Sequence, residues 1–194
     1  MKKTKSSCIE ILFAGFGGQG LITLIDIAVN AAFINGYDAK SSELHGLSQR
    51  GGAVATFLSF GKKVYSPLFK KAGANLIIGL ELLEGLRACD FANSKTKILV
   101  NDYFSPFLGI TPKDEILKNL RAIGKDNFNL VEASEICKEK LEKEVLAGMY
   151  LLGYAVNKKL IPIKPESVVK AIKEVIPEKY QEINIKAFKL AHDN

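Results

Sequence analysis

The chain carries the stretch IEILFAGFGGQG at residues 9–20, and this stretch decides the fold. Its first six residues are mostly apolar and predict a short buried strand. The residues after Gly20, up to about Asn35, predict a helix that is apolar except for a narrow polar stripe. A glycine-rich turn between a strand and a buried helix is typical of a layered α/β domain.

The composition narrows the class of protein. The 194 residues are 47% hydrophobic and 25% charged, which indicates one globular domain over residues 1–194. The net charge of +6 forms no basic stripe interleaved with aromatic residues, so we expect no nucleic-acid partner. Polar residues interrupt every apolar run, so we expect no membrane segment and a cytoplasmic protein. The three cysteines have no CxxC spacing and predict neither a metal nor a cluster site in this chain.

The remaining pattern predicts a three-layer α/β/α Rossmann-like domain with a mixed sheet and a helical C-terminal part. A hairpin from Gly61-Lys62 into Lys63-Val64-Tyr65 would make part of the sheet antiparallel. From Ser134, the expected N-cap, the pattern is helical to the end. A helix is expected over 82–91, and further strands are expected at Tyr37–Ser41, Ala53–Phe60, Asn75–Leu80, Lys97–Asn101 and Asn127–Val131.

The glycine turn is the first candidate site. Its spacing lets backbone N–H groups approach a ligand, and the helix N-terminus favours an anion such as phosphate. The alternative is a tight turn needed only for packing. A dinucleotide site also requires an acid about 20 residues further on, and only Asp38 and Glu43 are near enough. Neither lies at the end of the expected strand, which weakens this interpretation. The candidate cofactor-binding residues are Gly15, Gly17, Gly18, Gln19 and Gly20.

The segment SELHGLSQRGG at residues 42–52 is the second candidate site, and we expect it to be a loop. A carboxylate, an imidazole, an amide and a guanidinium are concentrated in it, which favours function over a loop that is merely pinned by an Arg50–Glu43 pair. His45 and Arg50 are the candidate catalytic residues. The further cofactor-binding candidates are Glu43, Gln49, Gly51 and Gly52. An acidic pair that follows an expected strand, Glu81 and Glu84, is expected to be a solvated helix start.

Together these segments resemble a known family. The resemblance is carried by Gly15-x-Gly17-Gly18-Gln19-Gly20 and Glu43-x-His45-Gly46-x-x-Gln49-Arg50-Gly51-Gly52, which are similar to the gamma-type domain of 2-oxoacid:ferredoxin oxidoreductases. The His45-Gly46 and Gln49 form is that of the indolepyruvate members. Further matches bring the resemblance to residues 9–190: Tyr65-Ser66-Pro67-Leu68, Glu81 to Arg87, and Asn184-x-x-Ala187-Phe188. Leu82 stands where the family usually has proline, which affects only a helix start.

The resemblance implies oxidative decarboxylation of an aryl pyruvate to an acyl-CoA, with ferredoxin as electron acceptor. Thiamine diphosphate with Mg and the iron–sulfur clusters would belong to a larger alpha subunit, coenzyme A would be a co-substrate, and this chain alone would hold no cofactor. Arg50 would meet the substrate carboxylate or a coenzyme A phosphate, and His45 would orient a substrate group or move a proton. Two alternatives stay open: a gamma subunit for pyruvate or a branched-chain 2-oxoacid, and a stand-alone nucleotide-binding module with Glu43 at the ribose.

Overall fold

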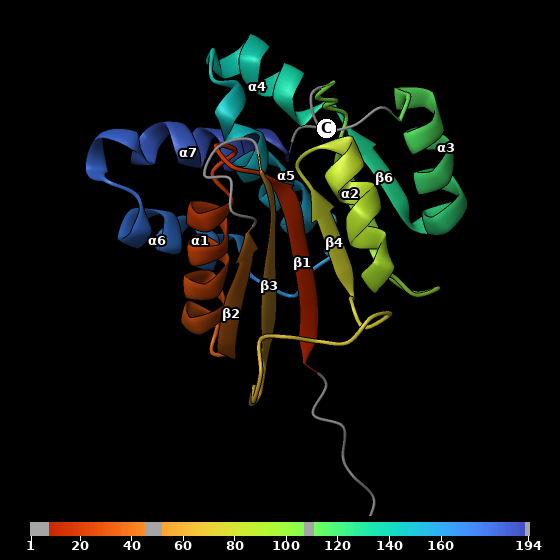
Figure 1. Cartoon of the computed structure of the whole chain (residues 1–194). Coiled ribbons are helices and arrows are strands. Elements are labelled where there is room, and N and C mark those ends of the chain that lie inside the picture. The colour runs from red at the N-terminus through yellow and green to blue at the C-terminus, as the bar shows by residue number, and fades with distance from the viewer. Residues whose placement is uncertain (1–7, 46–51, 107–110, 193–194) are drawn as a thin grey trace, which may run out of the picture.

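The computed structural model describes residues 8–45, 52–106 and 111–192 (Figure 1). The strands in these ranges are β1 (Ile9–Phe16), β2 (Asp38–His45), β3 (Ala53–Gly61), β4 (Leu76–Gly79), β5 (Lys97–Asn101) and β6 (Phe128–Val131). The α-helices are α1 (Leu21–Ile34), α2 (Leu82–Ala88), α3 (Lys113–Gly124), α4 (Ala133–Leu141), α5 (Ala147–Asn157), α6 (Pro165–Val175) and α7 (Glu178–Leu190). Short 3₁₀ helices are η1 (Cys89–Phe91), η2 (Lys125–Asn127) and η3 (Glu144–Leu146).

The six strands form one mixed sheet in the order β2-β3-β1-β4-β5-β6. From β1 through β4 and β5 to β6 all neighbours are parallel. The strand β3 pairs antiparallel with β1 on one side and with β2 on the other. The runs LIIG in β4 and KILVN in β5 are almost wholly buried, as strands covered on both faces require. The predicted mixed α/β sheet with a helical C-terminal part is confirmed.

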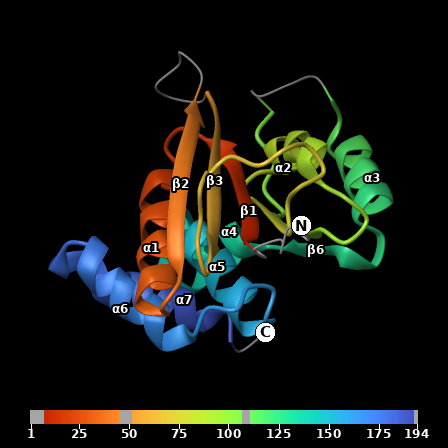
Figure 2. The same ribbon diagram turned by 90° about the horizontal axis from the view of Figure 1, so that it is seen from below.

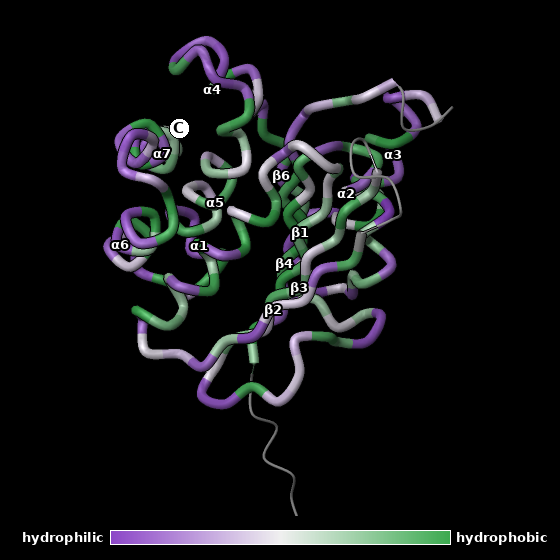
Figure 3. The backbone as a smooth tube through the Cα atoms, turned by 60° about the vertical axis from the view of Figure 1, so that its left-hand side comes forward, coloured by the Kyte–Doolittle hydropathy of each residue, from purple (hydrophilic) through white to green (hydrophobic). Residues whose placement is uncertain are grey.

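Helices cover both faces of the sheet and make three layers (Figure 3). Alternate residues of β1 serve the two cores: Ile11 and Phe13 pack beneath the layer of α1, α5, α6 and α7, whereas Leu12 and Ala14 pack against the side of α2 and α3. The Asn35 side chain, just after α1, accepts hydrogen bonds from the Lys164 N–H at 3.0 Å and the Ser167 hydroxyl at 3.2 Å, which holds α6 beside α1 (Figure 2). No helix within the described ranges is long and apolar enough to cross a membrane.

The prediction of a β-hairpin after β3 is wrong. After Gly61 the chain does not return as a strand, and β3 pairs with β1 and β2 instead. The Val64 N–H donates to the Asp38 carboxylate at 2.7 Å, so this segment crosses the amino-terminal end of β2 rather than extending the sheet. The antiparallel part of the sheet therefore exists, but non-local pairing creates it.

Three further expectations need correction. The strand β2 continues to His45, so residues 42–45 are not loop, because they pair with β3 as far as Val54. Ser134 does not cap α4: the N-cap is Glu132 without a side-chain bond, and Ser134 lies in the first turn. The helix α3 was not expected at all, since only Ile116, Leu120 and Gly124 of its residues are buried and its apolar signal is correspondingly sparse.

The packing of α5 on α7 depends on a glycine. A Cβ at Gly153 would overlap the Phe188 backbone carbonyl, which no side-chain rotation can relieve. A Cβ at Gly148, in the same helix, would meet only side-chain ends of Leu24 and Leu80, at 3.2 and 3.3 Å. The close approach of the two helices therefore requires glycine at position 153.

We expect Gly153→Ala to lower the free energy of unfolding by about 1–3 kcal/mol, because overpacking against backbone outweighs the better helix propensity of alanine. Gly148→Ala is the matched control, since it gains the same propensity and meets only movable side chains; it should lower stability less. Urea denaturation of the full chain measures both. Equal effects of the two substitutions would contradict this account.

Candidate functional site

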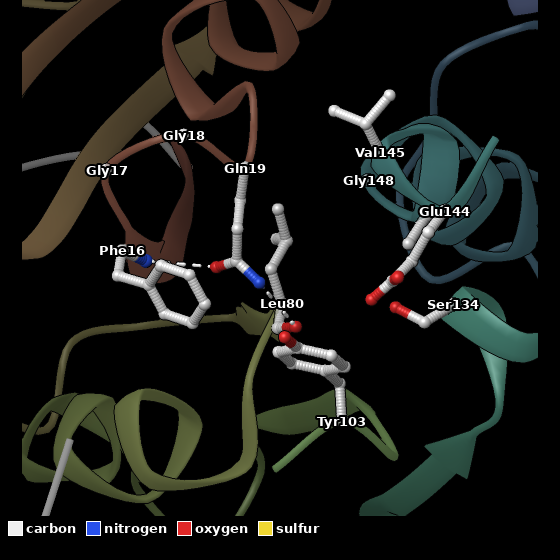
Figure 4. A pocket seen from close by; sticks show the side chains of 11 residues that line it. Phe16, Gly17, Gly18, Gln19, Leu80, Tyr103, Ser134, Glu144, Val145 and Gly148 are labelled. Atoms are coloured by element: carbon white, nitrogen blue, oxygen red, sulfur yellow. Dashed lines mark hydrogen bonds between the residues drawn. The ribbon is translucent and has the colours of Figure 1, made fainter. Parts of the chain in front are cut away.

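A cavity of about 430 Å³ lies at the carboxyl ends of the parallel strands. After β1 the chain leaves through α1 on one face of the sheet, whereas after β4 it leaves through α2 on the other face. Neighbouring strands with such opposed connections form a topological switch point, where open α/β sheets bind ligands. The cavity is lined by Phe16, Gly17, Gly18, Gln19, Leu80, Tyr103, Ser134, Glu144, Val145, Ala147 and Gly148 (Figure 4).

The Gln19 side chain holds the glycine turn against the end of β4. Its amide oxygen accepts from the Phe16 N–H at 2.9 Å, and its amide nitrogen donates to the Leu80 carbonyl at 3.2 Å (Figure 4). A Cβ at Gly15 would lie 2.5 Å from the Gln19 amide oxygen and within 3.2 Å of Leu21 and Leu80 side-chain atoms. The first glycine of the motif is therefore required by this close packing.

At two further glycines of the turn, Gly18 and Gly20, the backbone stays accessible at the edge of the cavity. Gly18 and Gly20 have φ angles of 106° and 76°, in the region that favours glycine. Within the described part of the chain, no side chain caps the α1 N-terminus at Gly20, and its first turn has no acidic residue. The helix end thus keeps its partial positive charge.

A buried asparagine, Asn101, is hydrogen-bonded to two residues of the cavity lining, Leu80 and Ser134. The Asn101 amide nitrogen donates to the Leu80 carbonyl at 3.1 Å and to the Ser134 hydroxyl oxygen at 2.9 Å, while its amide oxygen accepts from the Ser134 N–H at 3.1 Å. Asn101 is fully buried, so these bonds fix the end of β5 and the start of α4 against β4. The Ser134 hydroxyl oxygen is occupied as an acceptor, and its hydrogen can donate into the cavity.

Tyr103 and Glu144 complete the lining. Burial raises the pKa of Tyr103 above its ordinary value, and the carboxylates of Glu144 and Glu81 raise it further. The Tyr103 hydroxyl therefore stays protonated at neutral pH. Glu144 is exposed, and its carboxylate faces the same space as the Ser134 hydroxyl (Figure 4).

The acidic pair at the start of α2 is not solvated, contrary to expectation. Glu81 is fully buried and Glu84 is 5% exposed. The Glu81 carboxylate caps α2 by accepting from the Glu84 N–H at 2.9 Å, and it also accepts from the Ser105 N–H at 3.2 Å. The Glu84 carboxylate forms a salt bridge with the Arg87 guanidinium, with an N–O distance of 2.5 Å. Burial raises the pKa of Glu81 above its usual range, although these backbone bonds oppose the shift. Helix α2 begins normally with Leu82 in place of proline because the Glu81 side chain caps it.

The structure brings the two sequence-predicted segments together in part. The Gly17 N–H donates to the Gly52 carbonyl at 3.0 Å, so the end of the second segment touches the glycine turn. In the sheet, Gly15 is opposite Val54, and Val54 is opposite His45. The backbones of Gly15 and His45 therefore lie at the same level of the sheet, with β3 between them. Glu43 is an exposed residue of the edge strand β2. The candidates Gln49, Arg50 and Gly51 lie outside the described residues.

The strand order weighs against a dinucleotide site. Strand β3 lies between β1 and β2, so Glu43 is about 10 Å of sheet width away from the strand that carries the glycine turn. Asp38 is the first residue of β2, and its carboxylate is bonded to the Val64 N–H. Neither acid is therefore placed as a ribose ligand next to the turn would be.

Sequence reasoning missed Tyr103, Glu144 and Asn101 as site residues and noticed Ser134 only as a helix cap. Three of them share one signal, which is position: Asn101, Tyr103 and Ser134 each lie at or shortly after the end of a parallel strand. Beside this cavity lies a second one of about 590 Å³ between α1, α5 and α7, which shares Gln19, Val145 and Gly148 with it.

Comparison with known proteins agrees with this architecture. The family model described as pyruvate ferredoxin/flavodoxin oxidoreductase matches residues 10–194. The chain therefore belongs to the pyruvate ferredoxin/flavodoxin oxidoreductase family.

Within the family, the chain is similar to the indolepyruvate oxidoreductase subunit IorB of Archaeoglobus fulgidus, with 32% identity over 192 residues that cover 95% of this chain and 94% of that protein. It is 30% identical to the pyruvate/ketoisovalerate oxidoreductases common subunit gamma of Pyrococcus abyssi, covering 95% and 96%. The crystal structure of a keto/oxoacid ferredoxin oxidoreductase gamma subunit from Geobacter sulfurreducens PCA has the same fold, with a TM-score of 0.69 at 23% identity and coverage of 95% and 96%. The resemblance stated from the sequence is thus confirmed.

We expect Gly15→Ala to destabilise the chain mainly through the Gln19 amide. In a Gln19→Ala background this clash is absent, so the destabilisation by Gly15→Ala should be smaller by about 0.5–3 kcal/mol. A double-mutant cycle by urea denaturation measures this coupling.

The matched control combines Gly15→Ala with Gln181→Ala. Gln181 donates to the Lys173 and Ile176 carbonyls, and neither bond involves a residue of the turn, so it should be additive with Gly15. Additivity of Gly15 and Gln19 as well would contradict the proposed packing.

Proposed function

We propose that this chain is the non-cluster subunit of a thiamine-diphosphate-dependent 2-oxoacid:ferredoxin oxidoreductase that acts on indolepyruvate or other aryl pyruvates. The observation that carries the proposal is the match along nearly the whole chain to proteins named indolepyruvate oxidoreductase subunit IorB, at 32% identity in Archaeoglobus fulgidus. The His45-Gly46 and Gln49 form of the second segment supports the same choice.

The residues at the switch point do not fit thiamine diphosphate with its metal. Among the described residues of the cavity lining, the only charged side chain is the Glu144 carboxylate, which repels a diphosphate. Among the described residues, no group of three or more His, Cys, Asp or Glu side chains could hold a metal ion. In the proposal, a larger alpha subunit binds thiamine diphosphate, Mg and the iron–sulfur clusters. These supply the nucleophilic carbon and the route for electrons to ferredoxin, and coenzyme A accepts the acyl group.

This chain would contribute one wall of the active site. The turn held by Gln19 and the edge fixed by Asn101 give that wall a defined shape, which positioning of a substrate requires. In the proposal, Arg50 offers its charge to the substrate carboxylate or to a coenzyme A phosphate, and His45 orients a substrate group or moves a proton.

A second candidate is a gamma subunit for pyruvate or a branched-chain 2-oxoacid. It is favoured by the 30% identity to a Pyrococcus abyssi subunit named as common to pyruvate and ketoisovalerate oxidoreductases. The two candidates differ in substrate, so the kcat/KM values of the complex for indolepyruvate, pyruvate and 2-oxoisovalerate separate them.

Anaerobic affinity purification of the tagged chain from its native cells tests the proposal. We expect a large partner that carries thiamine diphosphate and iron–sulfur clusters, and a complex that reduces ferredoxin with indolepyruvate faster than with pyruvate. A chain that emerges alone with a bound nucleotide would overturn the proposal in favour of a nucleotide-binding module.

In the reconstituted complex, Arg50→Ala should lower kcat/KM for the 2-oxoacid on the order of tenfold or more, because a charge-assisted hydrogen bond to the substrate or co-substrate is lost. The matched control is Arg121→Ala, since Arg121 is exposed in the last turn of α3, away from the cavity, and should leave kcat/KM unchanged. An Arg50→Ala complex with unchanged kcat and KM would remove Arg50 from the site.

A further inference from the structure

The charge of the cavity limits what it can bind. Among the described residues that line it, Glu144 is the only charged one, and none is a lysine, arginine or histidine. The buried Glu81 lies close enough to Tyr103 to raise its pKa together with Glu144. The one charge in the described lining is therefore a carboxylate, which disfavours a phosphate or carboxylate group beside it. This holds although the cavity adjoins a glycine turn of the kind that often binds phosphate.

The walls favour a flat apolar group. The rings of Phe16 and Tyr103 lie with centroids 6.2 Å apart and tilted by 40°, and Leu80 and Val145 extend the apolar surface. Aromatic rings bind well to such tilted ring edges and faces. A cavity of about 430 Å³ is within the usual size range of small-molecule sites and has room for a bicyclic ring.

The polar groups are arranged around a hydrogen-bond acceptor. Asn101 fixes the Ser134 hydroxyl, whose hydrogen is available to the side where the Glu144 carboxylate lies (Figure 4). A carboxylate accepts a hydrogen bond from a ligand N–H more strongly than a neutral acceptor does. In its described lining, the cavity thus combines aromatic walls with one carboxylate acceptor.

We propose that this cavity binds the indole ring of the 2-oxoacid substrate, with the ring N–H donating to the Glu144 carboxylate. The inference rests on the proposed function and adds to it the residue that selects indole over other aryl groups. Because Glu144 repels the substrate carboxylate, the substrate enters ring first and its 2-oxoacid end stays outside the cavity, toward the partner subunit. Glu144 is then a specificity-determining residue.

Binding of ring probes to the full chain tests the assignment without any catalysis. The probes are indole and benzothiophene, which have the same bicyclic shape, but benzothiophene has sulfur in place of the N–H. We expect the ratio of indole to benzothiophene affinity to fall on the order of tenfold in Glu144→Met, because the acceptor is lost while side-chain length is kept. Glu139→Met is the matched control: Glu139 is exposed on α4 outside the lining, and the ratio should not change.

NMR titration gives both affinities and the residues that shift. Shifts confined to the residues around Tyr103, Ser134 and Gly17, and no competition from inorganic phosphate, support the proposal. An unchanged ratio in Glu144→Met, shifts confined to the adjoining cavity near Tyr180, competition by phosphate, or no saturable indole binding would each overturn it.

Kinetics of the complex separate this inference from the proposed function. If the Glu144→Met complex keeps the wild-type preference for indolepyruvate over phenylpyruvate, the inference fails while the function stands. If the wild-type complex oxidises no aryl pyruvate, the function fails, and the probe titration still decides whether the cavity recognises a ring N–H.

Discussion

The carboxyl edge of the sheet depends on the Gln19 amide, which joins the Phe16 N–H to the Leu80 carbonyl across a glycine that has no room for a Cβ. This one side chain ties the β1–α1 turn to the end of β4. The Leu80 carbonyl also accepts from Asn101, which in turn holds Ser134. A continuous set of amide hydrogen bonds therefore runs from the glycine turn to α4, and removing any member would leave buried polar groups without partners.

The polar groups of the cavity lining fall into two roles. Gln19 lines the cavity, but both ends of its amide are engaged within the chain, so it maintains shape. Tyr103, Ser134 and Glu144 face the interior with hydrogen-bonding capacity left over. A wall whose glycine turn and strand ends are fixed by hydrogen bonds suits a subunit that positions a substrate, while bond-making belongs to groups of another chain in the proposed complex.

How much could be predicted from the sequence depended on how local each signal was. The strands β4 and β5 were found because short, continuous apolar runs mark strands that are buried on both faces. The hairpin after Gly61 was wrong because a turn signal cannot reveal that both edges of β3 are already taken by β1 and β2. The burial of Glu81 was missed for a similar reason, since its partner Ser105 is 24 residues away. Of the candidate site, the glycine turn and the segment that ends at Gly52 were both identified from the sequence, whereas the Gly17–Gly52 hydrogen bond between them is visible only in the structure.

The sequence by itself determined the strand, glycine turn and helix of residues 9–34, the mixed α/β class and the family, because periodicity, glycine spacing and motif are properties of neighbouring residues. Only the tertiary structure decided that β3 lies between β1 and β2 and that Leu80, Tyr103, Ser134 and Glu144 surround one cavity. The physical reason is that strand order follows from burying two faces of a sheet at once. That is a non-local condition, and it brings together side chains whose local sequence carries no sign of a common site.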